Sequence, residues 1–321
     1  MQQNTHPPGA DTLIVILGAG SIGVAFAATF SQAGFAVVVV DPDATRRESV
    51  PFGLAQQYAA IADAGLGHGT PGDVVVEQTP DMYLATAAMV LECGPEDLAT
   101  KQRIFAELLA KTGESTMLAT ASSAITMSMI VPDVALQSRC LVAHPVNPPS
   151  ILRVVELVPA PGTRPDTTDT VAGLFCQAEF QTVVLGHEIE GFVLNRLQGA
   201  VLREAYRLVE DGVTDVAGID AIMRMGLGPR WALSGPFETA ELNTPGGIKA
   251  HAARMGPAYK RMGEARGETV EWSDDLVAQV AAQRRAMLAE GDIPGRVAWR
   301  AKAVAQLVAK RDALMADPDD E

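Results

Sequence analysis

The chain has 321 residues, 48% of them hydrophobic, and its 25 basic and 39 acidic residues give a net charge of −14. This length exceeds what one ordinary hydrophobic core serves and suits two domains. A chain this acidic repels phosphate backbones and anionic bilayers, which argues against nucleic-acid-binding and membrane-surface proteins. The sequence has no run of about 18 apolar residues, the length that a membrane helix needs.

The three cysteines, Cys93, Cys140 and Cys176, are odd in number and far apart. They predict neither a disulfide framework nor a metal site, and they favour a reducing compartment, the cytoplasm. Residues 1–11 lack a basic start and an apolar stretch, so we expect a disordered tail there and no signal peptide. The acidic residues 317–321 are expected to form a second disordered tail.

The N-terminal part of the chain begins with a strand, a helix and a second strand. Residues 13–20 form an apolar run that ends in glycines, which predicts a buried parallel strand. Residues 21–34 predict a helix that ends at a glycine, and 35–41 predict a second buried strand that ends in an acid. Together they form a βαβ unit. Residues 44–72 are helical and then glycine-rich, as in a crossover or an insertion.

The same alternation continues through the next hundred residues. Strands are expected at 89–93, 116–122, 139–145, 153–158 and 181–186, with a helix at 95–111. This order predicts an α/β fold with a Rossmann-type doubly wound, mainly parallel sheet over residues 12–188.

No strand pattern returns after residue 187. Helices are expected at 191–212, 216–228, 236–256 and 274–313, and the second of these should end at its glycine. We therefore expect an all-helical second domain over residues 189–316.

Residues 18–23 read GAGSIG and match the pattern G-x-G-x-x-G between a predicted strand and a predicted helix. In that pattern the first glycine permits a tight turn, the second lets the backbone approach a pyrophosphate, and the third lets helix and strand pack closely. The phosphates are bound at the helix N-terminus. The residues expected to bind a dinucleotide are Gly18, Gly20, Ser21, Ile22 and Gly23.

Asp41 ends the second predicted strand, 18 residues after Gly23. Its carboxylate can accept hydrogen bonds from both hydroxyls of the adenosine ribose and repels a 2′-phosphate, so the predicted cofactor is NAD rather than NADP. Arg46 and Arg47 could bind that phosphate, but they lie past the strand end, which favours a solvated helix start.

Glu156 is the one acid in the apolar segment RVVELV and lies twelve residues after His144. Burying a carboxylate is costly unless a partner compensates its charge. If one ring nitrogen of His144 donates to Glu156, the tautomer is fixed and the other nitrogen is free to act as a general base. The alternatives are a histidine satisfied in the core and an ion pair of Glu156 with Arg153. Residues three apart on a strand point to opposite faces, which disfavours that ion pair.

Several longer segments have a family resemblance. VLECGPEDLATKQRIF, TASSAI, AHPVNPP, VVELV and GFVLNRL occur in the order and spacing of the L-3-hydroxyacyl-CoA dehydrogenase superfamily, which the chain resembles over residues 12–250. The segments VELVP, LVEDG and MGLGPRWALSGPFET are most similar to the branch that contains L-gulonate 3-dehydrogenase and λ-crystallin.

The resemblance implies an NAD-dependent dehydrogenase that oxidises the 3-hydroxyl group of an L-3-hydroxy acid. His144 would remove the hydroxyl proton, Glu156 would orient His144, and hydride would pass to the nicotinamide. The family also assigns substrate contacts to Ser123 and Asn195. From the sequence alone Ser123 could equally be the N-cap of a following helix, and Asn195 is a mildly poor helix residue. The resemblance also implies a homodimer formed through the helical domain.

The resemblance places Glu96 and Lys101 at the nicotinamide end of the cofactor. The alternative interpretations are an acid at a helix N-terminus and a solvated lysine. Asn147 could polarise the substrate carbonyl or simply form a turn.

The substrate is expected to be a small free hydroxy acid rather than an acyl-CoA. A CoA-binding protein needs basic surface for the phosphates, whereas residues 42–72 hold two arginines and no lysine. Arg230 could bind a substrate carboxylate in a bidentate manner. The alternatives are an L-3-hydroxyacyl-CoA, L-carnitine, whose quaternary ammonium would need aromatic residues such as Trp231, and a crystallin-like structural or NAD-sensing protein.

Overall fold

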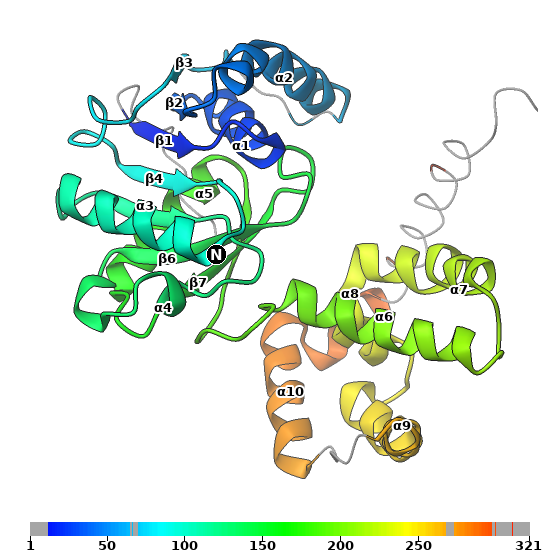
Figure 1. The fold of residues 1–321 in the computed structure, drawn as a ribbon. Coiled ribbons are helices and arrows are strands. Elements are labelled where there is room, and N and C mark those ends of the chain that lie inside the picture. The colour runs from blue at the N-terminus through cyan, green and yellow to red at the C-terminus, as the bar shows by residue number, and fades with distance from the viewer. Residues whose placement is uncertain are drawn as a thin grey trace, which may run out of the picture. The chain divides into compact units, whose positions relative to one another are not determined.

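The computed structural model describes residues 12–64, 66, 70–267, 273–296, 299 and 310 (Figure 1). The predicted tails, 1–11 and 317–321, lie outside the described residues. The chain forms two compact units, Met1–Val201 and Leu202–Glu321. The domain boundary predicted from the sequence, near residue 188, stays a prediction.

The first unit contains an eight-stranded sheet in the order β3-β2-β1-β4-β5-β6-β7-β8. The strands are β1 Leu13–Leu17, β2 Ala36–Val40, β3 Val74–Glu77, β4 Met89–Glu92, β5 Met117–Thr120, β6 Cys140–Pro145, β7 Val154–Pro159 and β8 Gln181–Val184. All neighbours pair in parallel except β6 and β7, which are antiparallel. The predicted Rossmann-type, mainly parallel sheet is confirmed.

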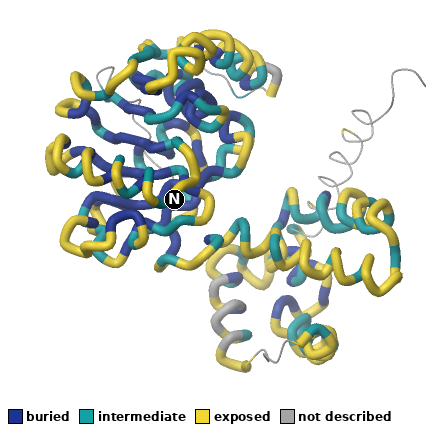
Figure 2. The backbone as a smooth tube through the Cα atoms, viewed as in Figure 1, coloured by how far each residue is buried: buried dark blue, intermediate teal, exposed yellow. Residues whose placement is uncertain are grey.

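Helices cover both faces of this sheet, which is why its central strands are apolar on both sides. The helices are α1 Ser21–Gln32, α2 Ala44–Asp63, α3 Leu98–Lys111, α4 Met127–Ile130 and α5 Pro165–Gln177. Successive strand residues point to opposite faces. Thus Ile14 and Ile16 join the core with α1, α2 and α5, whereas Val15 joins the core with α3 and α4. Figure 2 shows the buried strands as the dark interior of this unit.

Strand β3 and helix α5 were not predicted from the sequence. The segment 44–72, interpreted as a crossover or insertion, contains helix α2, and the chain then forms β3 at the edge of the sheet beside β2. Strand β3 has only four residues and none is fully buried. Helix α5 connects β7 to β8, which makes that last pairing parallel.

The second unit is helical over the residues that the structure describes. Helix α6, Leu194–Glu210, starts in the first unit and continues into the second. It is followed by α7 Val216–Ile222, a π-helical turn Met223–Leu227, α8 Gly228–Leu242, α9 Gly247–Ala265 and α10 Asp274–Met287. No helix of the described residues is long and apolar enough to span a membrane.

Three helices predicted in this unit differ from those of the structure. The helix 216–228 does not stop at Gly228, which has a helical φ of −56°, and the chain runs on into α8. The helical backbone is interrupted instead at Gly235 within α8, where φ is +55° and ψ is 177°, a conformation that glycine adopts readily because it has no Cβ. The predicted helix 236–256 is interrupted between α8 and α9. The predicted helix 274–313 is interrupted after Met287 by residues 288–292, and residues 293–296 are helical again.

Gly23 has no room for a side chain. A Cβ atom there would lie 1.9 Å from the carbonyl oxygen of Gly18, a backbone atom. We expect Gly23→Ala to lower the free energy of unfolding by about 3 kcal/mol or more, at or above the upper end of ordinary overpacking. Urea denaturation measures it. The control is Gly173→Ala on α5, where nothing lies within 4 Å of the added Cβ; it should stabilise the helix by about 0.5–1 kcal/mol. Equal effects of the two variants would contradict the packing argument.

Candidate active site

The dinucleotide turn follows the carboxyl end of β1. Gly18 has a φ of +113°, and a Cβ atom there would lie 2.7 Å from the carbonyl oxygen of Cys93, so only glycine fits. Helix α1 has Gly20 as its N-cap, with no side-chain cap and no acid in its first turn. Its first amides, from Ser21 and Ile22 onward, are therefore available to an anion, and the turn fits a dinucleotide pyrophosphate.

Asp41 lies beside this turn, just after β2. It is buried, and its Oδ2 accepts a hydrogen bond from the amide of Ala19 at 2.8 Å, while Oδ1 accepts from the amide of Asp43 at 2.9 Å. These bonds fix the carboxylate next to the glycine turn and leave lone pairs on both oxygens. This geometry fits the predicted contact with ribose hydroxyls.

Arg46 and Arg47 occupy the first turn of α2, as predicted, but their side chains differ. Arg47 Nη1 donates to the carbonyl oxygens of Asp41 and Pro42 at 2.7 and 2.9 Å, so it supports the loop after β2. Arg46 is exposed, and its Nη1 lies 4.0 Å from the position that a Cβ atom on Gly20 would take.

The structure brings His144 and Glu156 together. They are directly opposed in the antiparallel pairing of β6 and β7, which explains their spacing of twelve residues. Nδ1 of His144 lies 2.7 Å from Oε2 of Glu156, and the two residues are 6% and 4% exposed. Because an ionised carboxylate only accepts hydrogen bonds, Nδ1 carries the proton and Nε2 is the free nitrogen. No described residue forms a hydrogen bond with Nε2.

Glu156 has further donors on its other oxygen. Oε1 accepts from the amides of Val193 and Leu194 at 2.8 and 3.0 Å, where α6 begins. Burial raises the pKa of Glu156, but the hydrogen bonds from His144 and the two amides outweigh it and lower the pKa below its ordinary value. The alternative ion pair with Arg153 is not formed, since the guanidinium of Arg153 pairs with Glu179.

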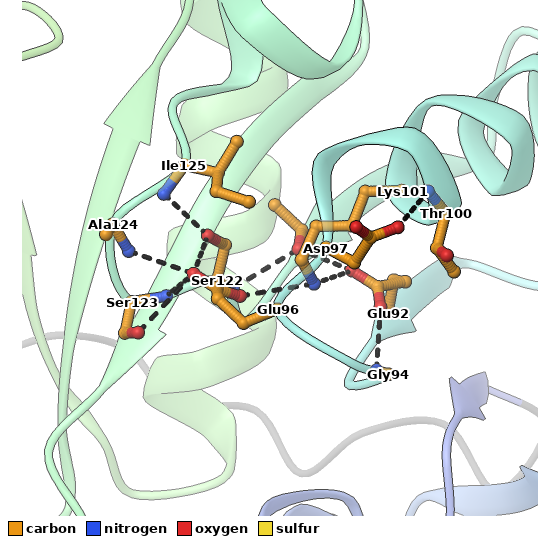
Figure 3. A network of polar contacts seen from close by, with 11 residues as sticks. Glu92, Gly94, Glu96, Asp97, Thr100, Lys101, Ser122, Ser123, Ala124 and Ile125 are labelled. Atoms are coloured by element: carbon orange, nitrogen blue, oxygen red, sulfur yellow. Dashed lines mark hydrogen bonds and ion pairs between the residues drawn. The ribbon is translucent and has the colours of Figure 1, made fainter.

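A second buried carboxylate, Glu92, stands at the end of β4 (Figure 3). Its Oε2 accepts from Lys101 Nζ at 2.7 Å and from Thr120 Oγ1 at 2.6 Å, and its Oε1 accepts from the amide of Gly94 at 2.7 Å. Lys101 is only 1% exposed, so the solvated lysine considered from the sequence is wrong. Its ammonium also lies 3.5 Å from Oε2 of Glu96.

Glu96 connects this network to the turn after β5. Its Oε1 accepts from Ser122 Oγ at 2.6 Å and from the amides of Ser123 and Ala124 at 2.9 and 3.1 Å. Burial raises the pKa of Glu96, but the Ser122 hydrogen bond, the charge of Lys101 and the two amides lower it below its ordinary value. Glu96 is therefore an anchor for this turn.

The structure also tests the alternative interpretations of Glu96 and Ser123. Glu96 does lie at the N-terminus of α3, directly before the N-cap Asp97, which accepts from the amide of Thr100 at 2.8 Å. The N-cap of α4 is Thr126, so Ser123 does not cap it. The exposed side chain of Ser123, at the carboxyl edge of the sheet, donates a long hydrogen bond of 3.4 Å to Oε1 of Glu96.

Asn195 joins the Ser123 turn to the start of α6, because its Nδ2 donates to the carbonyl oxygen of Ser123 at 2.8 Å. Asn147 is exposed in the loop after β6, and no described residue forms a hydrogen bond with its side chain. Arg230 lies on α8 in the second unit, where its Nε donates to the carbonyl oxygen of Gly226 at 3.1 Å.

Sequence reasoning missed Glu92 and Phe192. Glu92 carries the same signal as Glu156, a lone acid in an apolar strand, and the same argument applied to β4 would have found it. Phe192 is buried, its ring lies 5.3 Å from that of His144, and its φ is +48°. No sequence signal predicts a left-handed phenylalanine.

The thiols of Cys93 and Cys140 and the described metal-ligand residue types do not form reactive sites. Burial raises the pKa of Cys140 to about 12 and that of Cys93 further still, so neither thiol is a nucleophile at neutral pH. No described group of three or more His, Cys, Asp or Glu side chains could bind a metal ion.

Comparison with known proteins decides the family. Residues 13–189 match the 3-hydroxyacyl-CoA dehydrogenase NAD-binding domain, and residues 191–287 match the C-terminal domain of the same family. The chain belongs to the 3-hydroxyacyl-CoA dehydrogenase family. It is an NAD-dependent dehydrogenase, and the predicted cofactor and enzyme class are confirmed.

The relatives of this dehydrogenase carry several names. The λ-crystallin homologue of Rattus norvegicus is 34% identical over 276 residues, covering 83% of this chain and 85% of the relative. An L-carnitine dehydrogenase of Streptomyces griseus is also 34% identical, covering 74% and 71%. The solved structure of a 3-hydroxyacyl-CoA dehydrogenase from Archaeoglobus fulgidus has a TM-score of 0.73 at 21% identity, covering 94% and 99%, and shows the same fold. The predicted λ-crystallin branch is confirmed.

The buried Glu92–Lys101 pair of this dehydrogenase predicts a large penalty when one partner is lost. Lys101→Met should lower the free energy of unfolding by about 3–5 kcal/mol, because it leaves Glu92 as an uncompensated buried charge. The double variant Glu92→Gln/Lys101→Met should recover part of that loss, as measured in urea. As control, Lys111→Met breaks the exposed pair with Asp81 and should change nothing measurable. Additive effects of the Glu92 and Lys101 substitutions would contradict the pairing.

Proposed function

We propose that the chain oxidises the 3-hydroxyl group of a small free L-3-hydroxy acid, of the L-gulonate type, to the 3-keto acid, with His144 as general base. The supporting observation is the hydrogen bond of 2.7 Å between His144 and Glu156, which leaves Nε2 free. Strands β1, β4, β5 and β6 run parallel, so His144, near the end of β6, shares an edge of the sheet with the dinucleotide turn after β1.

The proton transfer follows from the charges around the ring. Glu156 is ionised at neutral pH, accepts the Nδ1 proton and keeps the imidazole in the tautomer whose Nε2 can take the substrate hydroxyl proton. The imidazolium that results is stabilised by the same carboxylate. NAD, when bound, supplies the hydride acceptor. Ser123 and Asn195 are proposed to orient the substrate hydroxyl, since Asn195 binds the Ser123 backbone and the exposed Ser123 side chain donates to Glu96, which leaves its hydroxyl oxygen able to accept.

A free acid is favoured over a CoA ester by the surface near the cofactor. Residues 42–72 carry two arginines and no lysine, and Arg47 is already bound to backbone carbonyls. Little positive charge therefore remains there for the phosphates of CoA. Arg230 is the proposed ligand of the substrate carboxylate, and Asn147 of its carbonyl.

The substrate class is tested by initial rates of NADH formation with L-gulonate, L-3-hydroxybutyrate, 3-hydroxybutyryl-CoA and L-carnitine. We expect the highest kcat/KM with a free hydroxy acid, and a lower rate when NADP replaces NAD. Arg230→Met should raise KM for the free acid and leave the dissociation constant of NADH unchanged. Turnover confined to the CoA ester or to L-carnitine would show that the proposed substrate is wrong.

The role of His144 predicts a specific kinetic change. His144→Gln should lower kcat by about 10²- to 10⁴-fold, the usual contribution of a general base. NADH binding, followed by fluorescence titration, should not change. The matched control is His187→Gln, at an exposed histidine, which should keep the wild-type rate. A wild-type rate in His144→Gln would refute the proposed function.

We also infer a homodimer formed through the helical domain and a cytoplasmic location. Helix α6 has no buried residue, and its tube is coloured exposed or intermediate in Figure 2. Several of its exposed residues are large and apolar. They include Leu197, Val201, Leu202 and Val209. A subunit interface would cover such a face. The three cysteines are free thiols, which agrees with a reducing compartment.

A further inference from the structure

We propose that the first amides of α6, from Val193 and Leu194, form the positioning element of the His144–Glu156 dyad. They fix the carboxylate plane and so aim Oε2 at His144. This inference rests on the proposed function. It adds two backbone amides at the start of α6 to the side chains that β6 and β7 contribute to the site.

The first argument is that the two oxygens of Glu156 accept hydrogen bonds from different donors. Oε2 faces His144 Nδ1 at 2.7 Å, and Oε1 accepts both amides at 2.8 and 3.0 Å. With one donor alone, the carboxylate could rotate about its Cγ–Cδ bond. Two amides on Oε1 remove that freedom. The positive end of the α6 dipole adds to the stabilisation of the charge.

The turn before α6 is the second argument. Gly191 and Phe192 both have positive φ, +75° and +48°, and the amide of Phe192 donates to the carbonyl oxygen of Ile189 at 3.1 Å. A phenylalanine adopts this conformation only where its surroundings impose it. Here the turn places the Phe192 ring against His144 and directs the next two amides at Glu156.

The third argument is the hydrogen bond formed by Asn195, the residue that follows these amides. Asn195 donates to the carbonyl oxygen of Ser123, whose own amide donates to Glu96. The start of α6 is thus hydrogen-bonded to the proposed base through Glu156 and to the proposed substrate serine through Asn195. One short segment supports both groups and keeps their separation constant.

A backbone donor can be removed without changing the neighbouring side chains. Leu194 is the first helical residue of α6, a position where proline is well tolerated because its ring matches the helical φ. Leu194→Pro deletes the amide hydrogen, whereas Leu194→Ala shortens the side chain and keeps that hydrogen. A second deletion is the ester variant, in which the α-hydroxy acid analogue of leucine replaces Leu194 by nonsense suppression. Its ester oxygen cannot donate.

In the full-length enzyme, the proline and ester variants should lower kcat by about 10- to 100-fold relative to Leu194→Ala, as expected for losing a hydrogen bond to a charged group. KM for NAD and the dissociation constant of NADH should not change. The spectroscopic readout is the low-field proton resonance of His144 Nδ1–H, identified by its loss in His144→Gln. It should persist in Leu194→Ala and shift or broaden in the two deletion variants.

If Leu194→Pro fails to fold, the ester variant decides. The inference is overturned if the donor-deleted enzyme matches Leu194→Ala in kcat and keeps the low-field resonance. That outcome leaves the proposed function intact as long as His144→Gln is inactive. A fully active His144→Gln enzyme, in contrast, refutes the proposed function itself, so the two failures are distinguishable.

Discussion

The carboxylate of Glu156, 4% exposed, is the constraint around which the site is built. A buried anion is tolerated only when donors surround it. Its donors come from a side chain on β6 and from two amides at the start of α6, so strands and helix must meet at one point. The antiparallel pairing of β6 and β7 meets this need by placing His144 directly opposite Glu156.

Two further carboxylates at this edge of the sheet are also surrounded by hydrogen-bond donors. Glu92 is surrounded by Lys101, a threonine hydroxyl and an amide, and Glu96 by a hydroxyl, two amides and the charge of Lys101. The pKa values of Glu96 and Glu156 lie below their ordinary value of 4.5. Each carboxylate therefore contributes stability that is complete above pH 4.5, the unfolded-state value, and lost as the pH falls through its folded pKa. The acids that organise the site also make it sensitive to acid.

The sequence was most informative where one chemical requirement dominates. A lone acid in an apolar strand needs a partner, and this argument found His144 for Glu156. Gly18 and Gly23 were predicted from the spacing of the glycine pattern, and the structure gives the reason for both, since backbone atoms occupy the space that a side chain would need. Lys101 was ambiguous, since position on a helix does not reveal which face meets the sheet edge. Phe192 could not be found, because tertiary packing rather than local preference imposes its conformation.

The start of α6 has a consequence for which substitutions the site tolerates. Val193 and Leu194 donate through backbone atoms, so their contribution is indifferent to which side chains these positions carry. Substitution of either side chain by any residue other than proline therefore leaves both amide donors of Glu156 in place. Relatives at 34% identity include proteins named λ-crystallin homologue and L-carnitine dehydrogenase. In this chain, side chains at the start of α6 can differ without removing the donors of the buried carboxylate.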